Sequence, residues 1–475
     1  MFLHSLSYLA FLAAVVLISW RLKTPRRRSA FLLLASYVFY ACFSVRFVLL
    51  LLGLTFATYY LARFGGERSR RRLLAWISVG ISLGTLGVFK YADFFTQTVR
   101  AGIGLPASPG LQVLLPIGIS FYTFQAISYS VDVYQGRMAP AVRLQDFALY
   151  LAFFPKLIAG PLVRPGLFLQ QLENPTAPLS RERVMRGGGL LLLGLVRKVL
   201  IADSLAGLAQ TAFRAAGMTS VAIPFPAPLY WQGFYLYAFQ IYADFAGYTD
   251  IARGSAILLG FDLPANFMQP YFSTSVGAFW NRWHMTLTQW FRDYLFNPLS
   301  RKGLTAFGKR GARPVQVAVT LLTMTLVGLW HGASWTYAAW GCWHGILLSM
   351  ERVLGWRPTS GGQRILGAVI TFHLVGIGWV LFGAASLGTA GRFLAGVASL
   401  EGLRWLSLYL SPVILGGILV FGIDVVASRP GAAQSAKWRR WLPVFATSAL
   451  IVLLSLAALA LIRGESARPF IYGRF

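Results

Sequence analysis

The stretch FVLLLLGLTFATYYLARFGGERSRRR, residues 47–72, joins an apolar run to a strongly basic loop. The apolar part, 47–64, approaches the roughly 20 residues that cross a bilayer as a helix. The same pattern recurs along the 475-residue chain, of which 56% is hydrophobic and 12% is charged, whereas a soluble domain carries roughly 25% charged residues. The pattern therefore predicts a helical protein that crosses the membrane several times.

The basic residues gather in short loops between apolar runs, as in 21–28, 63–72 and 301–313. The net charge of +28 thus follows the positive-inside rule, which favours a membrane topology over nucleic-acid binding. No charge precedes the apolar run 5–20, so we expect a retained helix with its N-terminus outside the cytoplasm. Basic cytoplasmic loops would also attract an anionic acyl donor.

We predict an all-α polytopic protein with about eleven to thirteen membrane helices, some partial or re-entrant. No repeat or Gly/Ser linker marks a second domain. We therefore expect one transmembrane domain over 1–475, with N-terminal hairpins at 1–90, a central region at 111–352 and C-terminal helices at 365–475. Beyond the first four, the apolar runs are 111–128, 186–202, 227–243, 251–261, 315–330, 335–350, 365–383, 408–426 and 440–462.

Two segments do not fit a lipid-facing helix. FFPKLIAGPLVRP (153–165) contains three prolines and Lys156, and irregular backbone at membrane depth requires protein or water around it. We expect this segment to be re-entrant or packed inside the bundle. FWNRWHMTLTQWFRDYLFNPL (279–299) is rich in aromatic residues but too polar for lipid, so we expect one interfacial or buried helix there.

Ionisable groups inside a membrane domain are costly, and each is a candidate for function. The candidates are Lys156, Asp203, Asp244, Asp250, His284, Arg292, Asp293, His331, His344 and His373. His331 and His344 share the local sequence Trp-His-Gly but are thirteen residues apart, so on one straight helix they would face opposite sides. We expect two successive helices joined around Gly332–Ser334.

No metal site or covalent nucleophile is predicted. HExxH, CxxC, GxSxG, DHHC and HxxxxD do not occur in suitable places, and Cys42 and Cys342 lie in apolar runs as packing residues. A neutral histidine acting as general base remains, because burial favours its uncharged form. The alternative is a histidine that is hydrogen-bonded for structure alone. A helix starting at Val315 would place His331 about 24 Å into a core of about 30 Å, nearer the outer side.

Four stretches resemble the membrane-bound O-acyltransferase family, particularly its bacterial, alginate-type branch. They are 153–165, YADFAGYTDIARGSAILLGFDLPANFMQPY (242–271), 279–299 and LVGLWHGASWTYAAWGCWHG (326–345), in that order. The ending RPFIYGRF (468–475) is similar to that of the alginate-type members and favours polysaccharide acetylation. LSRKG (299–303) replaces the usual Leu-Gly-Gly-Asn, which leaves loop and partner contacts open.

The resemblance implies a central acyl-transfer tunnel surrounded by helices, with His331 as the catalytic base. A second family position falls on His284, which would line the reaction chamber or position the donor, and His344 is assigned a structural role. Further residues are assigned to the substrate and donor tunnel: Lys156, Asp244, Trp283, Arg292, Asp293, Trp330 and Gly332.

The implied reaction starts from cytoplasmic acetyl-CoA, or an acyl carrier protein, and needs no permanently bound cofactor. The acetyl group would reach an exported polysaccharide such as alginate, directly or through periplasmic acetyltransferase partners, from a protein embedded in the lipid of the bacterial inner membrane. Another exopolysaccharide, cellulose or peptidoglycan is an equally compatible acceptor.

Two other function classes stay open from the residues: a transporter of acyl groups or lipid-linked sugars, and a scaffold for a separate periplasmic transferase. The transporter predicts that Asp244 and Asp250 dominate, and the scaffold predicts that His331 is dispensable.

Overall fold

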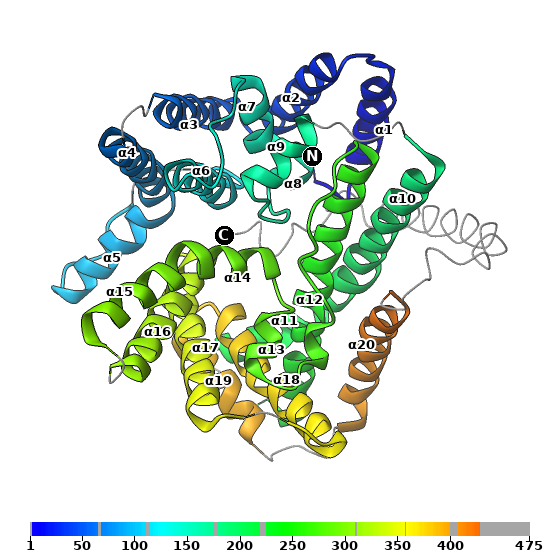
Figure 1. Ribbon diagram of the computed structural model, residues 1–475. Coiled ribbons are helices and arrows are strands. Elements are labelled where there is room, and N and C mark those ends of the chain that lie inside the picture. The colour runs from blue at the N-terminus through cyan, green and yellow to red at the C-terminus, as the bar shows by residue number, and fades with distance from the viewer. Residues whose placement is uncertain are drawn as a thin grey trace. The chain divides into compact units, whose positions relative to one another are not determined.

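The computed structural model describes residues 2–64, 68–110, 114–173, 179–218, 225–308, 311–356, 358–399 and 406–427. Within these ranges the chain forms helices joined by turns and short connections, and it contains no strand (Figure 1). The predicted all-α class is thereby confirmed. The apolar run 440–462 and the ending 468–475 lie outside the described residues.

The chain folds into two compact units, of which the first comprises Met1–Leu191 and Thr249–Pro264. Polar residues begin its first three helices: the side chains of Ser5, Thr24 and Ser44 accept hydrogen bonds from backbone N–H groups of the first turn, as N-caps do. The helices are α1 (Leu6–Arg21), α2 (Pro25–Ala41), α3 (Val45–Arg63), α4 (Arg68–Leu86), η1 (Gly87–Tyr91), α5 (Ala92–Gly102), α6 (Ile119–Tyr134), α7 (Leu144–Ala152), α8 (Phe154–Leu157), α9 (Pro165–Glu173) and the larger part of α10 (Arg181–Leu195).

The proline-rich segment 153–165 is packed inside this first unit. Phe154 is fully buried, and its ring lies 5.6 Å from that of Phe39 on α2 and 6.1 Å from that of Tyr8 on α1. A Cβ atom on Gly118 would overlap the carbonyl of Leu157, so the turn before α6 requires the bare glycine backbone. The expectation of a packed, partly irregular segment is confirmed.

The second unit comprises Leu192–Tyr248 and Ala265–Phe475. The apolar runs 227–243 and 251–261 contribute to one helix, α12, whose residues beyond Tyr248 belong to the first unit. The elements are η2 (Val196–Ala202), α11 (Asp203–Gly217), α12 (Ala227–Leu258), η3 (Pro270–Phe272), α13 (Val276–Trp280), α14 (Met285–Phe291), η4 (Arg292–Phe296), α15 (Asn297–Phe307), α16 (Ala312–His331), α17 (Trp335–Leu354), α18 (Gly361–Gly383), α19 (Leu387–Ala398) and α20 (Leu406–Ala427).

Asp244, on α12, has a buried partner on η2, which is a π-helical segment. The Lys198 ammonium lies 2.6 Å from the Asp244 carboxylate and 2.9 Å from that of Asp203. The Arg197 guanidinium lies 2.7 Å from the carboxylate of Asp424 on α20. Because charges buried in a protein need partners, these pairs allow acidic side chains in an apolar bundle.

The helix pair α16 and α17 packs very closely because glycines face the partner backbone. A Cβ on Gly328 would overlap the carbonyl of Tyr337, and one on Gly341 would overlap the carbonyl of Met324. Small residues at a helix interface let two backbones approach, which is how helices in membranes commonly associate. This close pair fixes the end of α16, where His331 lies.

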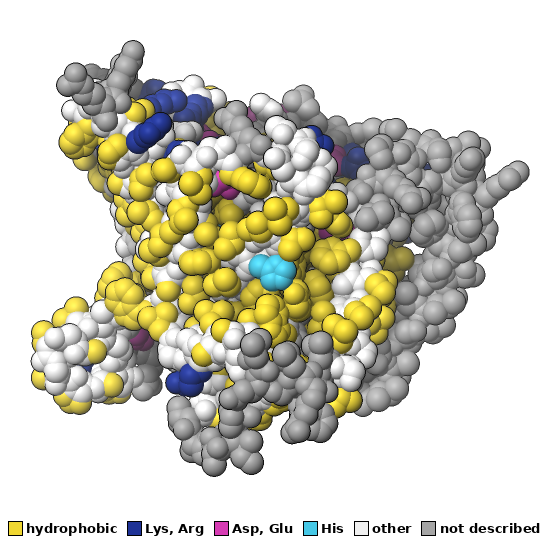
Figure 2. Space-filling view, turned by 90° about the horizontal axis from the view of Figure 1, so that it is seen from below, with side chains coloured by type: hydrophobic (Ala, Val, Ile, Leu, Met, Phe, Trp, Pro, Cys, Tyr) yellow, Lys and Arg dark blue, Asp and Glu magenta, His cyan; other side chains and the backbone are white. Residues whose placement is uncertain are grey.

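The outer surface is suited to lipid. Large apolar side chains such as Leu17, Leu49 and Ile365 are 62%, 63% and 71% exposed, and Figure 2 shows one face dominated by hydrophobic side chains. Five described helices are long and apolar enough to cross a membrane: Val45–Arg63, Ser69–Gly102, Ala312–His331, Gly361–Gly383 and Ser407–Asp424. The chain is thus a multi-pass membrane protein, whereas the total of eleven to thirteen helices and the segment limits 1–90, 111–352 and 365–475 stay predictions.

Candidate functional site

His331 is the last residue of α16, and Trp335 begins α17. The two-helix arrangement expected around Gly332–Ser334 is therefore confirmed, although α16 starts at Ala312 instead of Val315. The Ser334 side chain accepts a hydrogen bond from the Thr336 N–H at 3.3 Å, which caps the new helix. His331 thus sits where a regular helix gives way to a short connection.

Aromatic rings enclose His331, whose exposed fraction is 2%. Its ring centroid lies 4.8 Å from that of Trp330, 5.1 Å from that of Trp340 and 5.4 Å from that of Phe382. The interplanar angles of 81°, 89° and 71° are those of edge-to-face contacts. Such contacts hold an imidazole ring in place while keeping it away from bulk water.

His284 does not lie within a helix. The segment 279–299, predicted as one helix, is interrupted: α13 ends at Trp280, and His284 has a left-handed backbone with φ 42° and ψ 50° before α14 begins. A non-glycine residue in this region is uncommon and needs support from its surroundings. The single-helix prediction is wrong because the backbone bends to bring the buried His284 ring to its partners.

Asn266 supplies that support. Its backbone carbonyl accepts a hydrogen bond from the Met285 N–H at 3.0 Å. Its side-chain oxygen accepts from the Thr286 N–H at 3.2 Å and from the Thr286 hydroxyl at 2.7 Å. The His284 Nδ1 atom lies 3.3 Å from the same oxygen. Because an amide oxygen only accepts, the contact assigns the proton of a neutral His284 to Nδ1.

The two histidines meet although 47 residues separate them in the chain. Their ring centroids are 6.3 Å apart with an interplanar angle of 56°. The Trp330 ring lies 6.1 Å from that of His284, and Phe245 on α12 contacts His284 edge to face at 4.6 Å. Both imidazoles belong to the second unit, so this unit builds the pair by itself.

His344 lies inside α17 and is fully buried. Its Nδ1 atom accepts a hydrogen bond from the Trp280 indole N–H at 3.3 Å. The Trp340 ring contacts both histidines, with centroid distances of 5.1 Å to His331 and 5.2 Å to His344. These are the contacts of a packed side chain, and the structural role assigned to His344 stays a prediction.

Three other predicted site residues are next to the histidines in the sequence. Trp330 contacts both rings. Trp283 is fully buried and lies 4.7 Å from Trp379 between ring centroids. Gly332 has an extended backbone with φ −163°, which any residue adopts, but a Cβ atom there would overlap the Tyr337 ring. The missing side chain at Gly332 therefore leaves room for the Tyr337 ring.

The remaining predicted tunnel residues have other surroundings. Lys156, in the first unit, is fully buried and donates to the Gln125 side-chain oxygen and the Tyr150 carbonyl, both at 2.5 Å. Asp244 is held by Lys198 in the second unit. Arg292 and Asp293 lie 3.9 Å apart on η4 with side chains 51% and 39% exposed. Their assignment to the tunnel stays a prediction.

Sequence reasoning did not assign roles to Asn266, Trp340 or Phe382, although the first two lie within the quoted motifs 242–271 and 326–345. Their importance depends on which side chain faces a histidine. Among the residues described, no three His, Cys, Asp or Glu side chains come together as a metal site would require.

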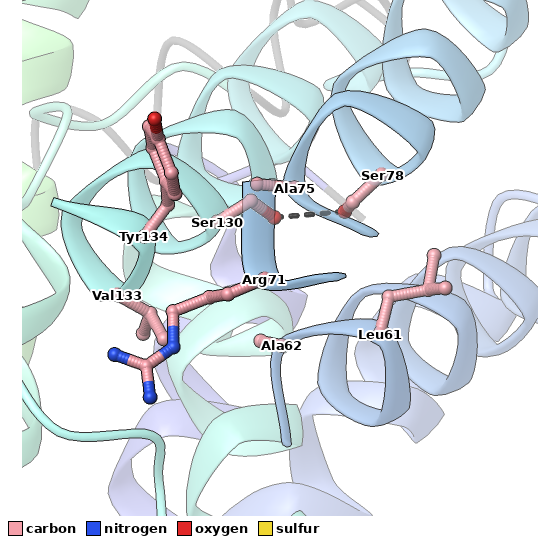
Figure 3. Close-up of a pocket in the computed structure, with 8 residues that line it drawn as sticks. All are labelled: Leu61, Ala62, Arg71, Ala75, Ser78, Ser130, Val133 and Tyr134. Atoms are coloured by element: carbon pink, nitrogen blue, oxygen red, sulfur yellow. Dashed lines mark hydrogen bonds between the residues drawn. The ribbon is translucent and has the colours of Figure 1, made fainter. Parts of the chain in front are cut away.

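A shallow pocket in the first unit lies between α3, α4 and α6 (Figure 3). The Ser78 and Ser130 hydroxyls share a hydrogen bond of 2.7 Å beside it, and Arg71 and Tyr134 also line it. None of its eight lining residues is a predicted site residue.

The chain matches the model of "MBOAT, membrane-bound O-acyltransferase family" over residues 139–357. It is 35% identical to "Probable alginate O-acetylase AlgI" of Pseudomonas aeruginosa, with 96% of both chains covered. It is 32% identical to "Peptidoglycan O-acetyltransferase" of Helicobacter pylori, over 80% of this chain and 75% of the relative. "Teichoic acid D-alanyltransferase" of Bacillus subtilis is 27% identical over 58% of this chain and 71% of the relative.

Proposed function

Because this chain belongs to the membrane-bound O-acyltransferase family and is an O-acyltransferase, we propose that it moves an acetyl group from cytoplasmic acetyl-CoA to an exported polysaccharide. The relatives that match nearly the whole chain bear the name of an alginate O-acetylase, which favours alginate or a similar glycan. Transfer passes through a central tunnel, directly to the glycan or through periplasmic partner proteins. The bacterial inner membrane, with the N-terminus outside the cytoplasm, belongs to the same proposal.

The observation that carries the proposal is the buried pair of His331 and His284, with 6.3 Å between ring centroids. In our mechanism, neutral His331 accepts the proton of the attacking hydroxyl as its oxygen bonds to the thioester carbonyl carbon. The carbon–sulfur bond then breaks, and the proton goes to the departing thiolate, which leaves as the free thiol. The product is an ester, and His331 returns to its neutral form.

We assign His284 a positioning role. Its contact with Asn266 leaves Nε2 as the ring nitrogen without a proton in the neutral form, so it offers an acceptor beside His331. An acceptor there can orient the incoming hydroxyl or the donor amide groups. Holding reacting groups in place is itself a large part of rate acceleration.

The basic loops support a cytoplasmic donor. Acetyl-CoA carries phosphate groups, and positively charged loops raise the local concentration of an anionic substrate. Radiolabelled acetyl-CoA added to inside-out membrane vesicles should label the glycan fraction. If labelling of the glycan required an acyl carrier protein, that protein would be the donor in place of acetyl-CoA.

The central test is ester-linked acetate on the exported glycan of cells that express wild type or His331→Ala. We expect acetate to be lost with His331→Ala and largely kept with His344→Phe, which alters the other Trp-His-Gly copy. Both variants must be present in the membrane at wild-type amounts. Wild-type acetylation by His331→Ala would overturn the proposed base and would favour a scaffold or transporter that serves a separate transferase.

A further inference from the structure

Four arginines converge on the end of α12 and the turn after it, all within the first unit. The Arg28 guanidinium donates to the Leu259 carbonyl at 2.9 Å, and that of Arg183 donates to the Ile257 carbonyl at 3.3 Å. Arg253 donates to the Leu263 carbonyl at 3.3 Å. Cations at a helix C-terminus satisfy free carbonyl groups and complement the helix dipole, so capping explains part of this cluster.

Capping does not account for the number of charges. Arg186 joins the group through a hydrogen bond to the exposed Asp262 carboxylate, and Arg183 lies 3.7 Å from the same carboxylate. Asp250 lies 3.9 Å from Arg253. Four guanidinium groups therefore share two carboxylates, which leaves the cluster positive overall.

Arg28 is a partly buried member of the cluster with the guanidinium of Arg183 nearby. Arg28 ends the basic loop 21–28, before the apolar run of α2. Burial, and then the nearby positive charge of Arg183, lower the pKa of Arg28 to about 10. The buried Nε atom of Arg28 has no hydrogen-bond partner among the described residues, and its guanidinium lies over the Trp20 ring at 3.6 Å. The cluster thus carries an excess of positive charge that an anionic ligand would offset.

The surface beside the arginines is apolar. On α1, Leu17 and Ile18 precede Trp20 and are 62% and 45% exposed. On α10, Val184 and Met185 stand between Arg183 and Arg186 in the sequence, on neighbouring faces of the helix, and are 41% and 40% exposed. Tryptophan is typical of the boundary between hydrocarbon and headgroups. The cluster therefore combines cationic groups with an apolar border.

We propose that Arg28, Arg183, Arg186 and Arg253 bind the phosphate of an anionic phospholipid, such as phosphatidylglycerol, whose acyl chains lie on the adjacent surfaces of α1 and α10. Planar guanidinium groups match phosphate oxygens in geometry as well as charge. Basic sites between membrane helices on the inner side are suited to anionic headgroups. The proposal is independent of acetyl transfer and is tested by binding alone.

The test uses the purified full-length protein in a neutral detergent, with lipid binding measured by native mass spectrometry. The probes are dioctanoyl phosphatidylglycerol and, as the zwitterionic comparison with no net charge, dioctanoyl phosphatidylcholine. Arg186→Gln should weaken phosphatidylglycerol binding about fivefold, as expected for about 1 kcal/mol per arginine. Phosphatidylcholine binding should be weaker than that of phosphatidylglycerol and should not respond to this substitution.

Asp262→Asn provides a result that a damaged fold cannot mimic. It removes the carboxylate that competes for Arg183 and Arg186, so phosphatidylglycerol should bind more tightly. Arg100→Gln is the matched control, because Arg100 also donates to a carbonyl, that of Pro106 at 2.8 Å, but is not part of the cluster. It should leave binding unchanged.

Equal affinity for the two lipids would overturn the proposal, and so would phosphatidylglycerol binding that neither Arg186→Gln nor Asp262→Asn changes. Coenzyme A and inorganic phosphate are added as competitors at equal concentration. Displacement of the lipid by either one would identify the ligand as a soluble phosphate compound and reject the phospholipid.

Discussion

The two Trp-His-Gly copies have the same local sequence but very different surroundings. The first copy, Trp330-His331-Gly332, lies at the end of α16. Its His331 ring lies 6.3 Å from the His284 ring between centroids. Trp343-His344-Gly345 lies inside α17, where His344 accepts a hydrogen bond from Trp280. One histidine is placed beside a second imidazole at a helix end, whereas the other lies in the middle of a helix and accepts from an indole N–H. An identical tripeptide therefore says little about a histidine's task.

The difference arises from the backbone around each copy. At a helix end, a side chain can be approached by a turn such as the one that carries His284. In the middle of a helix, the neighbouring turns and the packed helices occupy that space. The Trp340 ring contacts both histidines, so the two sites share one wall. Variants in matched pairs can separate their roles.

The largest expected difference is between His331→Ala and His344→Ala. Loss of a general base typically lowers a rate by about 10²–10⁴-fold, so we expect His331→Ala to remove measurable acetyl transfer. His344→Ala should mainly lower stability by about 1–3 kcal/mol, because it leaves the buried Trp280 donor without its acceptor. Transfer rates from single-turnover assays, together with melting of the purified variants, check both. Equal losses of rate at equal stability would contradict the distinction.

The paired glycines come next. Gly332→Ala forces a Cβ atom into the Tyr337 ring and should displace the connection that follows His331. A displacement of about 1 Å at a reacting group can lower a rate about 10²-fold. Gly345→Ala should have a smaller effect, because its Cβ would lie 3.1 Å from the Leu321 Cα, which a small helix shift relieves. The measurement is the transfer rate of each variant at equal amounts of protein in the membrane. Equal rates for the two variants would show that Gly332 has no special role in transfer.

Asn266 tests the His284 side of the pair. Asn266→Ala removes the oxygen that accepts from Thr286 and His284. Loss of such a hydrogen bond is worth about 1 kcal/mol, so transfer should fall about fivefold if that organisation is needed in the transition state. Asn266→Asp keeps the acceptor oxygen and should recover most of the rate. Similar rates for the two variants would show that this oxygen does not position His284.

The smallest effect is expected from Trp280→Phe. This change keeps an aromatic ring but removes the N–H that donates to His344. We expect a loss of stability of about 0.5–1.5 kcal/mol. The transfer rate should stay within about twofold of wild type, which corresponds to about 0.4 kcal/mol in the barrier. Thermal melting and the transfer assay measure the two quantities. A large loss of rate without a change in melting would give His344 a catalytic task.

Much of the fold was predictable because the relevant signals are local. Apolar length and basic loops identified the membrane helices, and the spacing of His331 and His344 predicted two helices joined around Gly332–Ser334. The break in 279–299 was not predictable in this way. The left-handed backbone of His284 depends on hydrogen bonds to Asn266, a residue that lies 18 positions earlier, outside any helix, and has no local signal.

The sequence by itself determined an all-helical membrane protein, its polar residues at membrane depth and the family motifs that single out His331 and His284. The tertiary structure alone decided that these two rings lie together, that Trp340 contacts both His331 and His344 and that Lys198 neutralises Asp244. The physical reason is the range of the interactions. Hydropathy and helix period act within a few turns, whereas contacts between side chains from different helices depend on how the whole unit packs.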